Sequence, residues 1–181
     1  NWMLDPALSG GAMYDLHVHD VDYVNYVLGA PDSLLASQRV SDPGGSYDII
    51  HALYQYRNGP QVHIHSGWGL AQTPFRAGFD AWFERGFVRL DPSGEPALLV
   101  YTDLVKVESS PAPYEKGDAY LNEIAYFLEC VEKDLPVEEC PPESARESLA
   151  LLEKELESIQ TGRTVQISSL NNEHGQGKQR K

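Results

Sequence analysis

Two carboxylates and an imidazole recur at helical spacing near the start of the sequence. Asp15, His19 and Asp22 stand at positions i, i+4 and i+7 of a largely apolar stretch. At about 100° per residue, the three side chains fall within an arc of about 60° on one face of a helix. A carboxylate beside an imidazole is the composition of a proton-transfer site, because imidazole titrates near neutral pH. The spacing therefore predicts an acid–base site on a helix face.

The segment that carries this stripe is predicted to be one helix over residues 10–28. The pair Gly10-Gly11 opens it, and Gly29 is a normal stop signal. Apolar side chains spread over more than half of its circumference, so we expect the helix to be covered on most sides. The polar stripe should then face a cleft or another domain.

Composition excludes several classes of protein. The 181 residues include 14 Lys and Arg against 27 Asp and Glu, which gives a net charge of −13. This charge argues against a nucleic-acid partner and against an anionic membrane surface. No apolar run approaches the roughly 20 residues of a membrane span. The two cysteines lack metal-ligand spacing and fit a reducing compartment, so we expect a cytoplasmic protein.

Alternating apolar and polar residues predict strands through the middle of the chain, and helical periodicity predicts two late helices. The expected strands are 34–41, 47–57, 61–68, a meander over 77–103, and 164–167. The expected helices are 119–133 and 143–160, the second with a capping box over Ser144–Glu147. Asn58-Gly59 is the strongest short hairpin signal in the sequence. Residues 168–181 are polar and Gly-containing, and we expect a flexible tail there.

This order of elements predicts an α+β fold with a large, mostly antiparallel open sheet and helices packed on one face. The other sheet face then needs a cover. The strands carry many aromatic residues, which favours an oligomer interface on that face. We therefore expect a homodimer or homotetramer that associates through the sheet face.

The first motif resembles a signature of a known enzyme family. Gly10-Gly11, then Asp15-x-x-x-His19-x-x-Asp22, then an apolar helix end at Gly29 is similar to the start of the second domain of the Gfo/Idh/MocA oxidoreductases. This is the family of glucose–fructose oxidoreductase and inositol dehydrogenase. The hairpin ending near Trp68, the Glu-Ile-x-x-Phe segment within 120–131 and the helix 144–160 agree in order. The resemblance covers residues 2–167 and concerns the C-terminal domain alone, so we expect one substrate-binding and oligomerisation domain over 1–167.

The resemblance implies hydride transfer at a CH–OH group of a sugar, polyol or related hydroxy compound, with NAD or NADP as cofactor. His19 would be the general base, and Asp15 would position the substrate or tune the imidazole. Asp22, Trp68 and His17 would contribute to substrate binding. The family's dinucleotide-binding (Rossmann) domain and its catalytic lysine are not in this sequence, so this chain should hold no cofactor-binding residue and should be inactive alone.

Other interpretations of the same residues stay open. His17 and Asp20 lie off the stripe and could form a buried polar pair, and Trp68 could belong to the core. His63 and His65 share one face of a strand and, with His17 or His19, could hold a metal by composition. Histidines on a solvent-facing strand are ordinary, however, and we predict no metal. A non-redox binding or oligomerisation module, or an NAD-using glycoside-cleaving relative, are the alternative functions.

Overall fold

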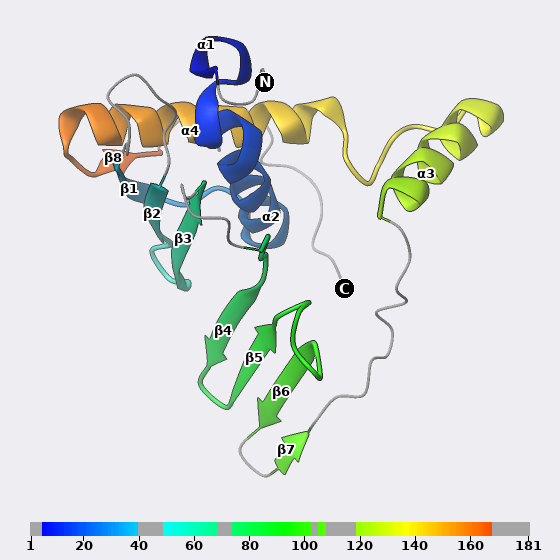
Figure 1. The fold of residues 1–181 in the computed structure, drawn as a ribbon, viewed down its shortest axis with the longest axis horizontal. Coiled ribbons are helices and arrows are strands. Elements are labelled where there is room, and N and C mark those ends of the chain that lie inside the picture. Colours follow the sequence, from blue (N-terminus) through cyan, green and yellow to red (C-terminus); the bar gives the residue numbers. More distant parts are fainter. Residues whose placement is uncertain (1–4, 40–48, 69–73, 103–104, 108–118, 168–181) are drawn as a thin grey trace. The chain divides into compact units, whose positions relative to one another are not determined.

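The computed structural model describes residues 5–39, 49–68, 74–102, 105–107 and 119–167 (Figure 1). The chain divides into two compact units. The first comprises residues 1–71 and 138–181, and the second residues 72–137. The candidate stripe and the core beneath it belong to the first unit.

A four-stranded antiparallel sheet, in the order β3-β2-β1-β8, forms the centre of the first unit. Its strands are β1 (Ser33–Arg39), β2 (Ile49–Gln55), β3 (Gln61–Gly67) and β8 (Val165–Gln166). Its helical elements are α1 (Pro6–Ser9), η2 (Met13–His17), α2 (Val18–Leu28) and α4 (Pro142–Thr161). Helix α4 packs against β1 and α2. One sheet face and these two helices therefore enclose the core.

The period-two patterns in the strands determine which face is buried. In β1, Leu34 and Ala36 are buried while Leu35 and Ser37 are exposed. The same alternation in β2 and β3 buries a row of side chains on the helix side, made up of Ile50, Ala52, Tyr54, Ile64 and Ser66. Cross-strand pairs from Ile49–Gly67 to Gln55–Gln61 confirm the hairpin predicted from Asn58-Gly59. The predicted strand residues 40, 41, 47 and 48 lie outside the described part of the chain.

The first predicted helix is present but is not a regular α-helix. Gly10 and Gly11 have positive φ angles of 75° and 71°, and the helical segment ends at Gly29, whose φ is 74°. Between them, Met13–His17 form a π-turn, in which the backbone N–H of Val18 donates to the carbonyl of Met13. The described part of the chain does not provide the predicted cover on all of these sides, because the apolar side chains Tyr26, Val27 and Leu28 are exposed.

The start of α4 corrects one prediction and its end confirms another. The helix begins at Pro142, after an extended Pro141, and no side chain caps it. Proline suits the first helical position because it has no N–H to satisfy, so the capping box predicted at Ser144–Glu147 is wrong. Gly162 ends the helix in the left-handed conformation, with φ at 64°, and its N–H donates to the carbonyl of Ser158 at 2.8 Å.

The second unit contains an antiparallel meander in the order β4-β5-β6-β7. Its strands are β4 (Phe79–Phe83), β5 (Gly86–Leu90), β6 (Leu98–Thr102) and β7 (Val105–Val107). The meander was predicted over 77–103, and β7 lies beyond its predicted end. Helix α3 (Ala119–Lys133) has the predicted bounds. Its apolar side chains are largely exposed, namely Tyr120, Leu121, Ile124, Phe127, Leu128 and Val131.

The predicted α+β class with antiparallel open sheets is confirmed. Among the described residues the strands divide between two four-stranded sheets rather than a single large one. In the first unit the helices pack on one face of the sheet, as the alternation in β1 to β3 requires. None of the described helices is both long enough and apolar enough to cross a membrane. The expected tail at 168–181 lies outside the described residues.

Candidate functional site

Asp15 and His19 are accessible and have no polar partner within the described part of the chain. Asp15 is half-buried in the π-turn, and His19 is exposed one residue into α2. No hydrogen bond or ion pair to another described residue occupies either side chain. Within the described part of the chain, their polar atoms are therefore available to a ligand. These are the two residues that the sequence ranked first for chemistry.

The π-turn changes how these two residues are related. Asp15 lies within the widened turn and His19 lies beyond it. The prediction of a common stripe used 100° per residue throughout, and this rotation does not hold across a π-turn. The two side chains still stand four residues apart on one continuous helical segment. Their relative direction is set by the π-turn rather than by regular helix geometry.

Asp22 is held by α4. Its Oδ1 accepts a hydrogen bond of 2.6 Å from Ser148 Oγ, and Asn25 Nδ2 lies 3.5 Å from the same hydroxyl. Ser148 and Asn25 are buried and Asp22 is half-buried. This contact ties α2 to α4, so Asp22 already has a partner inside the protein. Substrate binding by Asp22, which the sequence predicted, is not needed to explain its presence.

His17 is completely buried, and both of its ring nitrogens are engaged. Nδ1 lies 2.8 Å from Ser66 Oγ on β3, and Nε2 lies 2.7 Å from Glu155 Oε2 on α4. Ser66 Oγ in turn donates to Asp20 Oδ2. His17 and Asp20 are thus joined through one serine, which agrees with the interpretation of a buried polar pair. We therefore reassign His17 from substrate contact to a role inside the core.

Glu155 is, with Ser66, a member of this network that sequence reasoning missed. Its side chain is completely buried, and its Oε1 accepts a 2.7 Å hydrogen bond from the Tyr54 hydroxyl. Burial first, and then the Glu155 carboxylate, raise the pKa of Tyr54 above its ordinary value. The sequence did contain a signal for Glu155. Its position follows Leu151 and Leu152 and precedes Ser158 at helical spacing, and all three are buried, so the periodicity places a charged residue on the buried face of α4.

Trp68 packs against the core of the first unit. It is half-buried and contacts the cluster that includes Ile64 and Met13. Core packing, the alternative to a wall of the substrate pocket, explains this position. The structure therefore brings Asp15 and His19 to an accessible place, whereas Asp22, His17 and Trp68 all have partners inside the protein.

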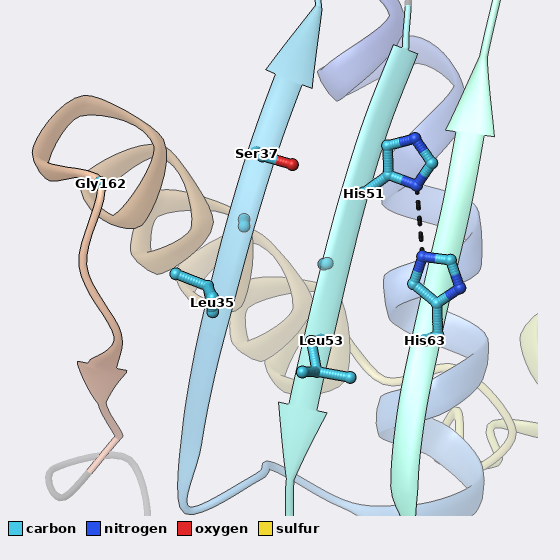
Figure 2. Close-up of a pocket in the computed structure, with 8 residues that line it drawn as sticks. Leu35, Ser37, His51, Leu53, His63 and Gly162 are labelled. Carbon is cyan, nitrogen blue, oxygen red and sulfur yellow. Dashed lines mark hydrogen bonds between the residues drawn. The ribbon is translucent and has the colours of Figure 1, made fainter.

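Among the described residues, His51 and His63 lie on the other face of the sheet (Figure 2). His51 on β2 and His63 on β3 point away from the helices, and His51 Nδ1 lies 3.2 Å from His63 Nε2. His65 stacks on His51, with ring centroids 4.5 Å apart. His51 and His63, but not His65, border a hollow whose other lining residues are Leu35, Ala36, Ser37, Ala52, Leu53 and Gly162.

This histidine cluster does not form the metal site weighed from the sequence. Its rings are nearly parallel, with interplanar angles of 1° to 8°, so their nitrogens do not converge on one point. His17 points into the core on the opposite side of the sheet, where it bonds Ser66. No group of three potential ligands among the described residues is placed to hold a metal ion.

A dinucleotide site does not fit the described residues either. Nucleotide phosphates are usually held where a parallel strand passes through a Gly-rich turn into a helix. Both sheets here are antiparallel in every described pairing. The helical segment that follows Gly10-Gly11 is preceded by α1 and not by a strand. We therefore assign none of the described residues to the cofactor.

Solved structures of other proteins share the fold described above. The chain matches the aldose–aldose oxidoreductase from Caulobacter crescentus, solved with glycerol, at a TM-score of 0.75 and 20% identity over 92% of this chain and 51% of that one. It matches a levoglucosan dehydrogenase, solved with NADH and levoglucosan, at 0.73 and 16% identity over 92% and 53%. It matches the UDP-N-acetylglucosamine 3-dehydrogenase from Acidithiobacillus ferrooxidans at 0.67 and 20% identity over 86% and 49%.

The chain spans about half the length of these solved relatives. No curated protein matches the sequence. The match to a sequence family is specific to the segment that holds the candidate site, because residues 1–89 match the GFO/IDH/MocA C-terminal domain. This match confirms the resemblance that Asp15-x-x-x-His19 indicated. Residues 1–89, which hold the candidate site, are therefore similar to the GFO/IDH/MocA C-terminal domain family.

Proposed function

We propose that this chain is the substrate-binding and catalytic-base half of a nicotinamide-dependent oxidoreductase that acts at a CH–OH group of a sugar or polyol. One observation carries the proposal. Asp15 and His19 are accessible and have no described partner, whereas the polar residues around them, His17, Asp20 and Asp22, are hydrogen-bonded within the chain. The solved relatives named above support the class of substrate, since they include sugar oxidoreductases.

The contribution of this chain is the movement of a proton. A hydroxyl carbon gives up hydride only as its oxygen loses a proton, so a base must sit at that oxygen. His19 would receive the hydroxyl proton on a ring nitrogen. Asp15 would accept a hydrogen bond from the substrate or orient the imidazole. A nicotinamide bound by another domain would supply the hydride acceptor, and NAD is the better supported form because a solved relative holds NADH.

The proposal includes two partners. The first is a dinucleotide-binding domain, and "the complete protein" below means this chain together with that domain. The second is another copy of the chain. In the second unit, Trp82 and Phe83 are 74% and 65% exposed, which supports a homodimer or homotetramer through a sheet face. Sedimentation of the complete protein as a monomer would contradict this part.

The experiment is a substrate screen with the complete protein. Reduction of NAD and NADP would be followed against a panel of sugars, inositols and their phosphates. We expect at least one CH–OH compound of the panel to support reduction. This chain alone should give neither turnover nor a dinucleotide-induced rise in its unfolding temperature. A complete protein that binds cofactor but oxidises none of the panel would contradict the proposed reaction.

A further inference from the structure

We propose that Ser66 and Glu155 are positioning residues for the candidate catalytic pair, because through His17 they hold the π-turn that sets the direction of Asp15 relative to His19. The catalytic part of this statement rests on the proposed function. The structural part, that the buried network maintains the π-turn, stands on this chain alone.

The first step of the argument is the position of His17. It is the last residue of the π-turn, and its ring is completely buried. One ring nitrogen meets β3 and the other meets α4. The turn is therefore attached at its end to two elements that are 49 and 138 residues away in sequence.

The second step is the directionality of the hydrogen bonds. Ser66 has one hydroxyl proton, which it donates to Asp20, so its oxygen accepts from Nδ1–H of His17. The Tyr54 hydroxyl donates to one oxygen of Glu155, and one proton lies between the other oxygen and Nε2 of His17. Each of these polar groups has a partner, so the plane of the His17 ring is fixed from both sides.

The third step links this network to the candidate pair. A π-turn contains one more residue than an α-turn, so its loss would rotate the residues before it by about 100° relative to those after it. Either His17 would leave the core or Asp15 would turn away from its present direction relative to His19. The first alternative would leave Oε2 of the buried Glu155 without its His17 partner. The second would also turn Met13, which is completely buried at the start of the π-turn, away from the core. The network and the burial of Met13 together therefore favour the π-turn.

The fourth step is the place of Ser66 along the helix. Ser66 contacts residue 17 through its oxygen and residue 20 through its proton. These two positions flank His19. A single hydroxyl from β3 thus holds the side chains of His17 and Asp20 on both sides of the candidate base, while the His19 side chain stays exposed.

Native-state amide hydrogen exchange of this chain tests the structural part. Ser66→Ala removes one attachment of His17, and we expect the backbone amides of Met13–Val18 to exchange at least about tenfold faster relative to the β1 and β2 amides. Ser158→Ala is the matched control. Ser158 is also a buried serine with two hydrogen bonds, one accepted from Ala36 N and one donated to the Arg163 carbonyl, but neither bond involves the helical segment of His17.

A conservative variant distinguishes the loss of the network's hydrogen bonds from a general loss of stability. Glu155→Gln can accept from Tyr54 and donate to Nε2 of His17, so it should keep exchange at the π-turn close to that of the unaltered chain. Equal exchange at the π-turn in Ser66→Ala and Ser158→Ala would overturn the proposal. Acceleration in Glu155→Gln as large as that in Ser66→Ala would overturn it as well.

Kinetics of the complete protein test the catalytic part. Ser66→Ala should lower kcat about tenfold or more with little change in KM for the cofactor, and Ser158→Ala should leave both near their original values. Unchanged kcat in Ser66→Ala would refute the positioning role. An unaltered complete protein without activity would refute the proposed function, while the exchange result would still decide the structural part.

Discussion

Two tyrosines of the β2–β3 hairpin have hydroxyl groups in different surroundings. Tyr54 is buried and donates to Glu155, whereas Tyr56 donates to the Gly29 carbonyl at an exposed site. Tyr54→Phe leaves a buried carboxylate oxygen without its partner and should lower the free energy of unfolding by about 1–3 kcal/mol. Tyr56→Phe should cost about 1 kcal/mol or less, because water can replace the lost donor. Urea denaturation of both variants compares them, and a larger cost for Tyr56→Phe would contradict the network.

His51 makes the free energy of unfolding depend on pH in the mildly acidic range. Burial, and then the charges of His65 and His63, lower the pKa of His51 below 6.5 in the folded state. Between that lowered value and 6.5 the unfolded chain binds a proton that the folded chain does not. The stability therefore falls as the pH decreases below about 6.5. His51→Gln should reduce this slope when the free energy of unfolding is measured from about pH 5 to about pH 7, and an unchanged slope would contradict the assignment.

At the scale of residues, sequence reasoning identified the accessible pair and missed what lies behind it. Asp15 and His19 were found because they stand only four positions apart on one helical segment, so local spacing alone connects them. The partner of His17 was not found, because Glu155 lies 138 residues away and nothing local connects them. Only the folded core brings α4 to that ring. Whether a charged residue is buried depends on tertiary contacts. Helical periodicity shows only that Glu155 is unusual among the apolar positions of its helix.

At the scale of elements, two glycines end helices in different conformations. Gly162 has φ 64° and ψ 23°, which is the left-handed region, whereas Gly29 has φ 74° and ψ −177°. An added Cβ would meet nothing within 4 Å at either position. Strain alone therefore decides the cost of substitution by alanine.

Gly29→Ala should destabilise the chain more than Gly162→Ala. Residues other than glycine reach the left-handed region at a cost of about 1 kcal/mol, but the conformation of Gly29 is essentially restricted to glycine, at about 1–3 kcal/mol. Chemical denaturation of the two variants measures the difference. Equal or reversed costs would show that Gly29 relaxes into another conformation.

Elements with strong local signals were predictable, and those defined by tertiary contacts were not. Asn58-Gly59 and period-two alternation determined the β2–β3 hairpin, and α3 begins and ends where predicted. The π-turn escaped prediction because a uniform helical period was assumed for Met13–His17. Strand β7 has only three residues and exists through its pairing with β6. The start of α4 was misplaced because the Ser144–Glu147 pattern was preferred to Pro142.

At the scale of the whole molecule, the described residues hold part of an active site under the proposed function. They present an imidazole and a carboxylate, and no dinucleotide cradle is found among them. The chain also corresponds to about half of each solved relative. Under the proposed function, this chain therefore carries out proton transfer while another domain binds the cofactor. Substitutions on α2 should then change turnover without changing the affinity for nicotinamide.

The kinetics of His19→Ala in the complete protein test this central claim most directly. We expect kcat to fall by about 10²–10⁴-fold with the KM for cofactor nearly unchanged, because the variant removes the base and no cofactor contact. His65→Ala is the matched control, since His65 is also exposed but lies on the outer face of β3, and it should keep kcat within about twofold. A fall in cofactor affinity equal to the fall in kcat, or the same loss of turnover in His65→Ala, would contradict the account.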